Sequence, residues 1–467
     1  MEPIKLEMVL KTFKTEFSGV KNEEYLSVST DSRNSVERGL FFALAGERFD
    51  GHDFVNQAID NGNVGIVIQR ENLEKVKGAI GKRIQKTTIF AVQDTLKALG
   101  DLASSYLKAM KARRIAITGS CGKTTTKEII SAILSVNHRV VKTEGNLNNL
   151  IGLPLTSFNV EATTEFAVLE MGMNAFGEIK RLTAISQPHI GLITNVREAH
   201  LEGVGSIEGV LSAKWELFEN IPEDSTCIVN LDDPMILKKA DSIKRKTITF
   251  SKNRRADVML ESEPLVHNDH SDVRLRIGQK NLSVRLNLAG MHNVDNLLAA
   301  VSVAFALGID TSDIKRGVES VQSVSGRMNL IRLSDSTVID DTYNANPSSM
   351  EGALRYLSLS DSSKRIAVLS DMLELGMDSY NLHFRIGTII AALKNIDFLV
   401  LLGREVVGIK DGAIKSGFDE NRIFMAISHN DAASIVRKLI EKNSAVLVKG
   451  SHSMRMDKVV EELKAIL

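Results

Sequence analysis

The feature that most constrains the fold of this chain is the alternation of short, strongly apolar runs with amphipathic segments, which begins at Arg113. Each run closes in polar or glycine residues, as in RRIAITG, EFAVLEMG, HIGLITNV and TCIVNLDD. Such runs are typical of strands buried on both faces of a parallel sheet, with functional loops at their carboxyl ends. Near residue 323 the pattern restarts with STVIDD, RIAVLSD, DFLVLLG, RIFMAIS and AVLVKGS. A second, smaller doubly wound domain is therefore expected there.

The chain divides into three regions of different character. Before the alternation begins, short strand-like runs (YLSVST, LFFAL, VGIVI, TTIFAV) are separated by turns. A chain of 467 residues is also too long for one ordinary core. We predict a three-domain α/β protein, with a small N-terminal domain at 1–108, a central P-loop-type doubly wound domain at 109–322 and a Rossmann-like domain at 323–467. Within the central domain, the pattern predicts a hairpin at 272–288 and a helix at 293–307.

Composition excludes several classes of protein. Lys plus Arg equals Asp plus Glu at 58 each, so no overall field would recruit nucleic acid or an anionic membrane. No run approaches the roughly 18 apolar residues needed to span a bilayer, and the charged N-terminus lacks a signal-peptide pattern. The two cysteines, Cys121 and Cys227, form no disulfide framework, which favours a reducing compartment. We predict a soluble cytoplasmic protein that neither binds nucleic acid nor inserts into a membrane.

The segment IAITGSCGKTTTKEII (115–130) carries the strongest functional signal. A strand would run into a glycine-rich loop and then a helix, which directs backbone N–H groups, the positive helix end and a lysine at phosphates. A threonine hydroxyl after the lysine would reach Mg²⁺. The two glycines are closer together than in the usual P-loop. We predict a nucleoside triphosphate site formed by Gly119, Ser120, Cys121, Gly122, Lys123, Thr124 and Thr125.

Two polar residues follow strands at the edge where a parallel sheet binds ligands. Glu170 ends the run FAVLE, and His200 lies in the loop after GLITNV. Each residue alone is better explained as a polar residue leaving a strand. Beside a phosphate loop, the pair favours a metal site in which Glu170 is a hard oxygen ligand for Mg²⁺. Because histidine is a less usual ligand for Mg²⁺, Mn²⁺ is an alternative.

Lys214 falls within the apolar stripe of the helix expected at 206–221 (SIEGVLSAKWELFENI). A bare ammonium in that position would be costly to desolvate, unless the side chain extends past its neighbours to water. Desolvation would otherwise lower the lysine pKa, and a neutral amine could add CO₂ to become a carbamate, an anion able to hold metal. The residues themselves leave both alternatives open.

Taken in order, these segments resemble the Mur ligases of peptidoglycan synthesis, which join amino acids or dipeptides to UDP-N-acetylmuramate. The resemblance spans nearly the whole chain and includes STDSR, FDGHDF, TGSCGKTTT, LEMGMN, REAHLEGVGS, AKWELF and GMHNVDNLLAA. Four further segments are most similar to the member that adds D-alanyl-D-alanine to UDP-N-acetylmuramoyl-tripeptide, namely TEGNLNNLIGLPLT, IDDTYNANPSSM, LSDMLELG and VKGSHSMRM. Ser370 and His452 depart from that member's pattern, which commonly has Gly and Arg there.

The resemblance implies an ATP-dependent ligase that forms an amide bond through an acyl phosphate. Its cofactors would be ATP and Mg²⁺ or Mn²⁺, and its substrates UDP-N-acetylmuramoyl-tripeptide and D-alanyl-D-alanine. The loop would hold the ATP phosphates. The residues that the resemblance assigns to the metal are Thr124, Glu170, His200 and a carbamylated Lys214. Those that it assigns to catalysis are Lys123, Lys214 and Arg327.

The same resemblance assigns residues that contact the rest of the nucleotide and the acceptor substrate. Asn293 and Asn296 would face the adenine, Arg327 a phosphate, and Asp341 the ribose. Four residues would bind the acceptor: Ser32 and Arg33 near its uridine diphosphate, and Asn148 and Asn149 near its peptide end.

Other functions remain as alternatives. The sister Mur ligase that adds diaminopimelate or lysine usually carries an Asp-Asn-Pro-Arg stretch in its C-terminal domain, which this sequence lacks. A folylpolyglutamate synthetase would lack the STDSR segment. A nucleotide-binding scaffold without turnover is a third alternative, which the intact set of Lys123, Glu170, His200 and Lys214 disfavours.

Overall fold

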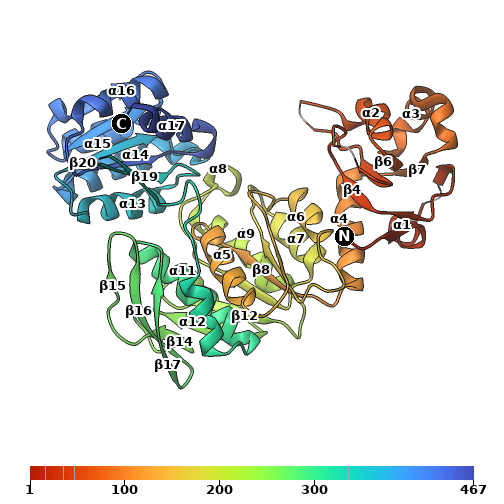
Figure 1. The fold of residues 1–467 in the computed structure, drawn as a ribbon, viewed down its shortest axis with the longest axis horizontal. Helices are drawn as coiled ribbons and strands as arrows, with labels where there is room; N and C mark the ends of the chain where they lie inside the picture. Colours follow the sequence, from red (N-terminus) through yellow and green to blue (C-terminus); the bar gives the residue numbers. More distant parts are fainter. Residues whose placement is uncertain (16, 35, 47, 335, 467) are drawn as a thin grey trace.

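The computed structural model describes residues 1–15, 17–34, 36–46, 48–334 and 336–466. Figure 1 shows three α/β domains, with the N-terminal and C-terminal domains on either side of a central one. Each domain is built on its own sheet, as the alternating apolar runs predicted. The predicted domain limits, after residues 108 and 322, stay predictions. No strand of the three large sheets crosses either limit among the described residues.

The described part of the N-terminal domain contains a five-stranded sheet in the order β2-β7-β6-β5-β4. The strands are parallel apart from β2, which pairs antiparallel with β7 at one edge. Its strands are β2 (Phe17–Gly19), β4 (Ser27–Ser29), β5 (Gly39–Phe42), β6 (Asn63–Gln69) and β7 (Thr88–Val92). Its helices are α1 (Leu6–Phe13), α2 (Val55–Asp60), α3 (Leu73–Ile80) and α4 (Thr95–Ala109). A separate pair joins β1 (Ile4–Lys5) to β3 (Glu24–Tyr25).

The central sheet has ten strands within the described residues, and β8 lies in the middle of its parallel part. The chain leaves β8, pairs β10 on one side of it, and then crosses to pair β11 on the other. Such a reversal opens a crevice at the carboxyl ends of the strands. The parallel strands are β8 (Arg113–Thr118), β9 (Val140–Lys142), β10 (Phe166–Glu170), β11 (Ile190–Ile193), β12 (Thr226–Asn230), β13 (Lys246–Ser251) and β14 (Val258–Leu260).

Antiparallel strands extend this sheet beyond β14, namely β15 (Leu265–Val266), β16 (Ser271–Ile277) and β17 (Lys280–Leu286). The predicted hairpin is confirmed, but its turn is shorter than the expected Gly-Gln-Lys-Asn, because Lys280 already pairs with Ile277.

Helices cover both faces of the central sheet, which explains why its strands are apolar without interruption. On β8, Ile115 and Ile117 pack in one core with α5 (Lys123–Leu134) and α11 (Met291–Leu307), whereas Ala116 belongs to the core of the opposite face. This alternation follows from the two-residue period of a strand. The other helices are α6 (Gly152–Ser157), α7 (Glu178–Ser186), α8 (Leu201–Val204), α9 (Ile207–Asn220), α10 (Pro234–Lys239) and α12 (Thr311–Glu319).

The C-terminal sheet has the order β18-β19-β23-β20-β21-β22 in the described residues, with only β18 antiparallel to its neighbour. All five predicted runs are confirmed as strands. The strands are β18 (Asn329–Leu333), β19 (Ser336–Asp341), β20 (Lys364–Ser370), β21 (Phe398–Leu402), β22 (Ile423–Ala426) and β23 (Ser444–Lys449). The helices are α13 (Pro347–Leu359), α14 (Ser379–Leu393), α15 (Val407–Lys415), α16 (His429–Leu439) and α17 (Asp457–Ile466).

The sequence predicted neither a membrane-spanning segment nor a disulfide framework. Among the helices described, none combines the length and apolar character that a membrane crossing requires. Cys121 and Cys227 are both free thiols.

Three glycines allow the backbones of α14 and α15 to touch. A Cβ atom added to Gly387 would lie 2.1 Å from the Ile409 carbonyl oxygen. One added to Gly412 would lie 2.0 Å from the Phe384 carbonyl oxygen, and one added to Gly408 would lie 2.9 Å from the Tyr380 carbonyl oxygen. Since backbone atoms cannot swing aside as a side chain can, only glycine fits this contact.

We expect Gly412→Ala to lower the free energy of unfolding by about 1–3 kcal/mol or more, because the added methyl group overpacks the contact between the helices. Gly352→Ala is the matched control, since it also lies on a helix of the C-terminal domain but faces open space. That change should stabilise by up to about 1 kcal/mol. Urea unfolding of the full chain measures both, and equal midpoints for the two variants would contradict the close packing.

Candidate active site

A cleft of about 680 Å³ lies at the carboxyl end of the central sheet. The central domain lines it with the loop after β8, the residues that follow β10 and β11, and the first turn of α11. The C-terminal domain contributes residues from 326–328 and 341–353, together with Lys449 and His452. Glu374 of the C-terminal domain and Leu96 on α4 of the N-terminal domain also line the cleft. The central and C-terminal domains thus enclose most of a space at the place where a parallel sheet binds ligands.

The loop between β8 and α5 depends on two glycines with positive φ angles, Gly119 at 148° and Gly122 at 81°. A Cβ on Gly119 would lie 1.9 Å from Thr194 Oγ1, and one on Gly122 would lie 2.1 Å from Asn296 Oδ1. Conformation and space thus both require glycine. The loop consequently presses against the residues after β11 and against α11.

Hydrogen bonds from the end of β11 fix the loop. The Cys121 N–H donates to Asn195 Oδ1 (3.0 Å), and Thr194 Oγ1 donates to the Cys121 carbonyl (2.6 Å). The Ser120 N–H donates to the Asn195 carbonyl (3.0 Å). These contacts orient the loop before any ligand arrives, which reduces the entropy cost of binding.

Lys123 and Thr124 open helix α5 beside a buried carboxylate. The Lys123 ammonium donates to the Gly119 carbonyl (2.6 Å), and Thr124 Oγ1 donates to Glu170 Oε2 (2.8 Å). Burial lowers the pKa of Lys123, while the negative charge of Glu170 opposes that shift. The other oxygen of Glu170 accepts from Asn148 Nδ2 (2.9 Å). A hydroxyl, a carboxylate and an amide therefore meet next to the lysine.

Asn148 and Asn149 both line the cleft, but their contacts differ. Asn148 bonds directly to Glu170, as described. Asn149 Oδ1 accepts from the N–H groups of Ile151 and Gly152 (3.1 and 2.9 Å), and so caps the turn that leads into α6. This contact positions the loop from which both asparagines project.

His200 joins the central domain to the C-terminal domain. Its Nδ1 lies 2.7 Å from Glu374 Oε2, although the angles do not meet hydrogen-bond geometry. Burial lowers the pKa of His200; the contact with Glu374 opposes that shift, and the charges of Lys214 and Lys123 reinforce it. A neutral imidazole is the form that can bind a metal.

Lys214 lies on α9, behind the cleft, and only 1% of its surface is exposed. Its side chain therefore does not extend to water, as the snorkelling alternative required. No hydrogen bond or ion pair of its ammonium is found among the described residues. Burial lowers its pKa well below the ordinary value, and the positive charge of Lys123 lowers it further. The neutral amine is accordingly favoured.

The predicted adenine residues line the cleft beneath the phosphate loop. Asn293 Nδ2 donates to the Ala289 carbonyl (2.7 Å), and Asn296 Nδ2 donates to Asn293 Oδ1 (3.0 Å). Asn296 Oδ1 also accepts from Thr126 Oγ1 (3.3 Å). These bonds tie the start of α11 to α5.

Arg327 and Asp341 line the cleft from the C-terminal domain. The Arg327 guanidinium stacks on the Tyr343 ring at 3.9 Å, and its buried Nε has no hydrogen-bond partner. Asp341 Oδ2 accepts from the buried ammonium of Lys449 (2.6 Å). An unsatisfied guanidinium donor beside the phosphate loop is suited to an anionic ligand.

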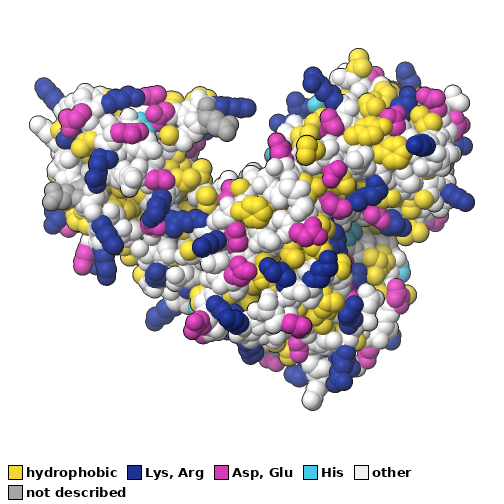
Figure 2. All heavy atoms as spheres, turned by 180° about the vertical axis from the view of Figure 1, so that it is seen from behind, with side chains coloured by type: hydrophobic (Ala, Val, Ile, Leu, Met, Phe, Trp, Pro, Cys, Tyr) yellow, Lys and Arg dark blue, Asp and Glu magenta, His cyan; other side chains and the backbone are white. Residues whose placement is uncertain are grey.

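Ser32 and Arg33 do not line the cleft. Ser32 Oγ donates to Gln57 Oε1 (2.7 Å), and Arg33 forms an exposed ion pair with Asp31 (2.6 Å). Both lie in the N-terminal domain, which an open notch separates from the C-terminal domain in Figure 2. The structure therefore brings together the predicted nucleotide and metal residues, with Gly119 and Lys214 just behind the cleft wall, but not the predicted uridine diphosphate residues.

Several residues in and around the cleft were not predicted from the sequence. Asn195 follows the apolar part of HIGLITNV and Lys449 follows that of AVLVKGS, so the rule that singled out Glu170 could have found both. Glu374 and Asn346 had no such signal. Asn346 contacts Cys121 Sγ across the domain boundary, with its side-chain atoms at 3.2 and 3.3 Å.

Comparisons with known protein families agree with this arrangement. The model for the Mur ligase family catalytic domain matches residues 24–107, and that for the Mur ligase middle domain matches 117–304. The model for the Mur ligase glutamate ligase domain matches residues 326–452.

Two curated relatives are similar over nearly their whole length, and both are named UDP-N-acetylmuramoyl-tripeptide–D-alanyl-D-alanine ligase. The protein from Bacillus subtilis is 36% identical over 438 residues, which cover 93% of this chain and 92% of the relative. The protein from Escherichia coli is 34% identical over 445 residues, covering 94% and 93%.

Solved structures are similar as well. MurF from Acinetobacter baumannii has a TM-score of 0.90 at 30% identity, covering 100% of this chain and 99% of that one. MurF from Thermotoga maritima in complex with ADP has a TM-score of 0.82 at 28% identity, covering 94% and 97%. With three matching domain models and relatives above 30% identity over almost the full length, this chain belongs to the Mur ligase family.

Proposed function

We propose that this protein is an ATP-dependent ligase that adds D-alanyl-D-alanine to UDP-N-acetylmuramoyl-tripeptide, yielding the pentapeptide precursor of peptidoglycan. The observation that carries the proposal is the cleft in which the phosphate loop, Glu170 and the unsatisfied Arg327 face one space from two domains. The names of the relatives support the choice of substrates. A cytoplasmic location belongs to the same proposal and rests on the two free thiols.

ATP would lie with its phosphates on the loop at 119–125. The N–H groups at the start of α5 and the ammonium of Lys123 would bind the phosphate oxygens, and Arg327 would reach a phosphate from the opposite domain. Asp341 would accept hydrogen bonds from the ribose, and Asn293 and Asn296 would lie against the adenine. Supporting this placement, all these side chains line the same cleft.

The residues around Glu170 fit a magnesium ion. Glu170 and Thr124 are buried, and their oxygens lie 2.8 Å apart beside the lysine that would contact phosphate. Oxygen donors of this kind suit Mg²⁺, and the neutral imidazole of His200 keeps Mn²⁺ as an alternative. When bound, the metal would neutralise charge on the transferring phosphoryl group.

The reaction proceeds in two displacements that need no protein nucleophile. An oxygen of the tripeptide carboxylate attacks the γ-phosphorus of ATP, the bond to the β–γ bridging oxygen breaks, and ADP leaves as the acyl phosphate forms. The dipeptide amine then attacks the acyl carbon and loses a proton, and phosphate departs from the tetrahedral intermediate. Lys123 and Arg327 would stabilise the charge that develops on the phosphoryl oxygens.

Binding of the acceptor would require the domains to close. Ser32 and Arg33 would hold the uridine diphosphate on the N-terminal domain, while Asn148 and Asn149 would contact the peptide end in the cleft. These two groups lie in different domains, and a notch opens between the outer domains in Figure 2. Closure would bring the three substrates together and exclude water from the acyl phosphate.

Lys214 would support the metal as a carbamate. A neutral amine attacks CO₂, and loss of a proton leaves an N-carboxylate in place of a cation. Burial first, and the charge of Lys123 second, lower the pKa of Lys214, and an N-carboxylate would replace this disfavoured cation with a group that the ammonium of Lys123 attracts. Attraction between this anion and the Lys123 ammonium would also offset part of the free-energy cost of burying a charge at this position.

Lys123→Ala should abolish ligation, because the cation that stabilises the transferring phosphoryl group is lost. We expect a loss of at least about 3 kcal/mol, or roughly 100-fold in kcat. Phosphate release is the measurement, with Lys108→Ala on the exposed end of α4 as the control. Near-normal turnover by the Lys123 variant would rule out the assignment of the phosphate loop.

Phosphate release should require both UDP-N-acetylmuramoyl-tripeptide and D-alanyl-D-alanine, because the acyl phosphate needs a carboxylate to form and an amine to be consumed. Each substrate is omitted in turn, and free diaminopimelate or lysine is offered in place of the dipeptide. Rapid turnover on the UDP-linked dipeptide with a free diamino acid would instead assign the chain to the sister reaction.

Lys214→Ala should reduce kcat by about 10- to 100-fold, as expected when a group that supports a metal is removed. Acetate should restore part of the activity by placing a carboxylate in the vacated space. The matched control is Lys127→Ala, since Lys127 is equally buried but donates to the Thr143 carbonyl, and acetate should not rescue it.

A second measurement separates a carbamate from an ordinary buried lysine. With ¹³C-labelled bicarbonate, wild-type protein should give a carbamate carbon signal that Lys214→Ala lacks. A plain amine in the electron density of a crystal grown with bicarbonate and an ATP analogue would refute the carbamate.

A further inference from the structure

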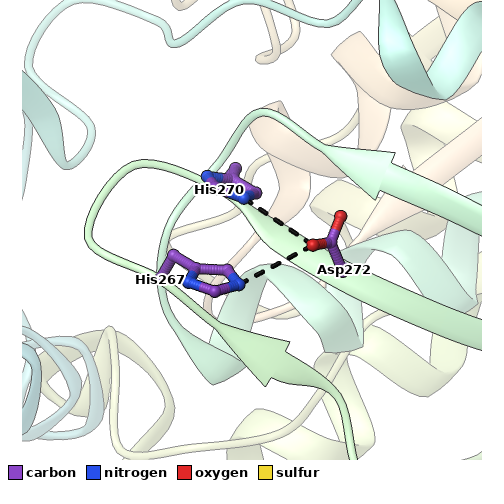
Figure 3. A group of neighbouring side chains, drawn as sticks. All are labelled: His267, His270 and Asp272. Carbon is purple, nitrogen blue, oxygen red and sulfur yellow. Dashed lines mark ion pairs between the residues drawn. The ribbon is translucent and has the colours of Figure 1, made fainter.

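A cluster of side chains that could hold a metal ion lies outside the cleft, in the loop that joins β15 to β16 and at the start of β16. His267, His270 and Asp272 offer ligand atoms that all lie within 4.8 Å of one another (Figure 3). The Nε2 atom of each histidine is 3.7 Å from Asp272 Oδ2. Because none of the three lines the cleft, the proposed reaction does not use them.

The two imidazoles are already arranged as a pair of ligands. Their rings stack with centroids 4.4 Å apart and an interplanar angle of 16°, so both Nε2 atoms point toward the same carboxylate. Contacts of 3.7 Å are too long for hydrogen bonds but close to the separation of two atoms that bind one metal ion. Small rotations of the side chains would complete the geometry.

Hydrogen bonds from outside the cluster orient two of the three ligands. Asp269 Oδ1 lies 2.7 Å from His270 Nδ1, a contact that holds the proton on Nδ1 and leaves the Nε2 lone pair free. A carboxylate behind a ligating histidine is a recurrent feature of metal sites. Arg285 holds that carboxylate with both nitrogens, since Nε donates to Asp272 Oδ1 (2.9 Å) and Nη2 makes a longer bond to Oδ2 (3.4 Å), which a metal ion would have to displace.

The donor set indicates which metal would bind. Two imidazole nitrogens and one carboxylate oxygen suit Zn²⁺ and its neighbours, whereas Mg²⁺ prefers oxygen donors alone. His267 is exposed and the other two side chains are half-buried, so water can complete the coordination. We propose that His267, His270 and Asp272 form a Zn²⁺-type site that is separate from the cleft.

The position of the site indicates a structural role. The same loop contacts the C-terminal domain, since the Tyr356 hydroxyl donates to the Asn268 carbonyl and Arg332 lies 3.8 Å from Asp269. A bound ion would fix the loop between the two histidines and hold these atoms against the neighbouring domain. It would therefore stiffen a contact between domains rather than take part in the reaction.

Calorimetric titration of the untagged full-length chain with Zn²⁺ tests the site, in excess Mg²⁺ and an ATP analogue that fill the cleft. His267→Ala and His270→Ala should each weaken one Zn²⁺-binding event by more than about 100-fold, and Asp269→Asn by about 10- to 100-fold. The matched control is His138→Ala, which removes a histidine that pairs with Glu165 but belongs to no group of three candidate ligands among the residues that the structure describes.

Two readouts decide the result. Co²⁺ bound to the wild type should give visible absorption bands of nitrogen-ligated metal that the His267→Ala/His270→Ala double variant lacks. Equal numbers of bound Zn²⁺ ions in the wild type and the double variant would overturn the proposal. Unfolding midpoints measured without metal check that all variants fold. We expect midpoints close to that of the wild type, because none of the substituted side chains is fully buried.

Discussion

The gathering of basic side chains around the buried carboxylate of Glu170 is the constraint around which the cleft is organised. Burial lowers the pKa of Lys123, Lys214 and His200, and the charge of Lys123 adds to the shifts of the other two. Glu170 opposes the shift of Lys123, and Arg327 reinforces it. Glu170 and Glu374 oppose the shifts of Lys123 and His200 only in part, because the pKa of each base remains lowered. The cleft is therefore built to be completed by negative charge, and a nucleoside triphosphate supplies it at the lysine while a carbamate would supply it at α9.

The topology of the central sheet makes this concentration of charge possible. β8 lies between β10 and β11, so the loops after all three strands meet at one edge. Glu170 arrives from β10, His200 from beyond β11, and Lys123 from β8. Gly119 and Gly122 then let the loop approach Thr194 and Asn296 more closely than any other residue would allow, and the Lys123 ammonium comes within reach of the charge of Glu170.

Contacts between domains join this centre to the C-terminal domain. His200 meets Glu374, and Cys121 meets Asn346, so the phosphate loop and the proposed metal ligands both touch the C-terminal domain. The hairpin loop at 267–270 touches the same domain from another side. Movement of the C-terminal domain would therefore shift residues that contact the phosphate loop. Such a coupling would allow domain closure to precede phosphoryl transfer.

The sequence by itself determined the strands, the phosphate loop and the place of Glu170, His200 and Lys214, because these depend on periodicity and on neighbours along the chain. STVIDD became β19 with the same bounds, and the stripe predicted at 206–221 became α9 with Lys214 buried on it. Only the tertiary structure decided that Asn195 closes the phosphate loop, that Glu374 reaches His200, and that Ser32 stands apart from the cleft. It also decided that His267 and His270 stack toward Asp272. These contacts depend on how strands and domains pack, and no local pattern encodes a distance between segments that are far apart in the chain.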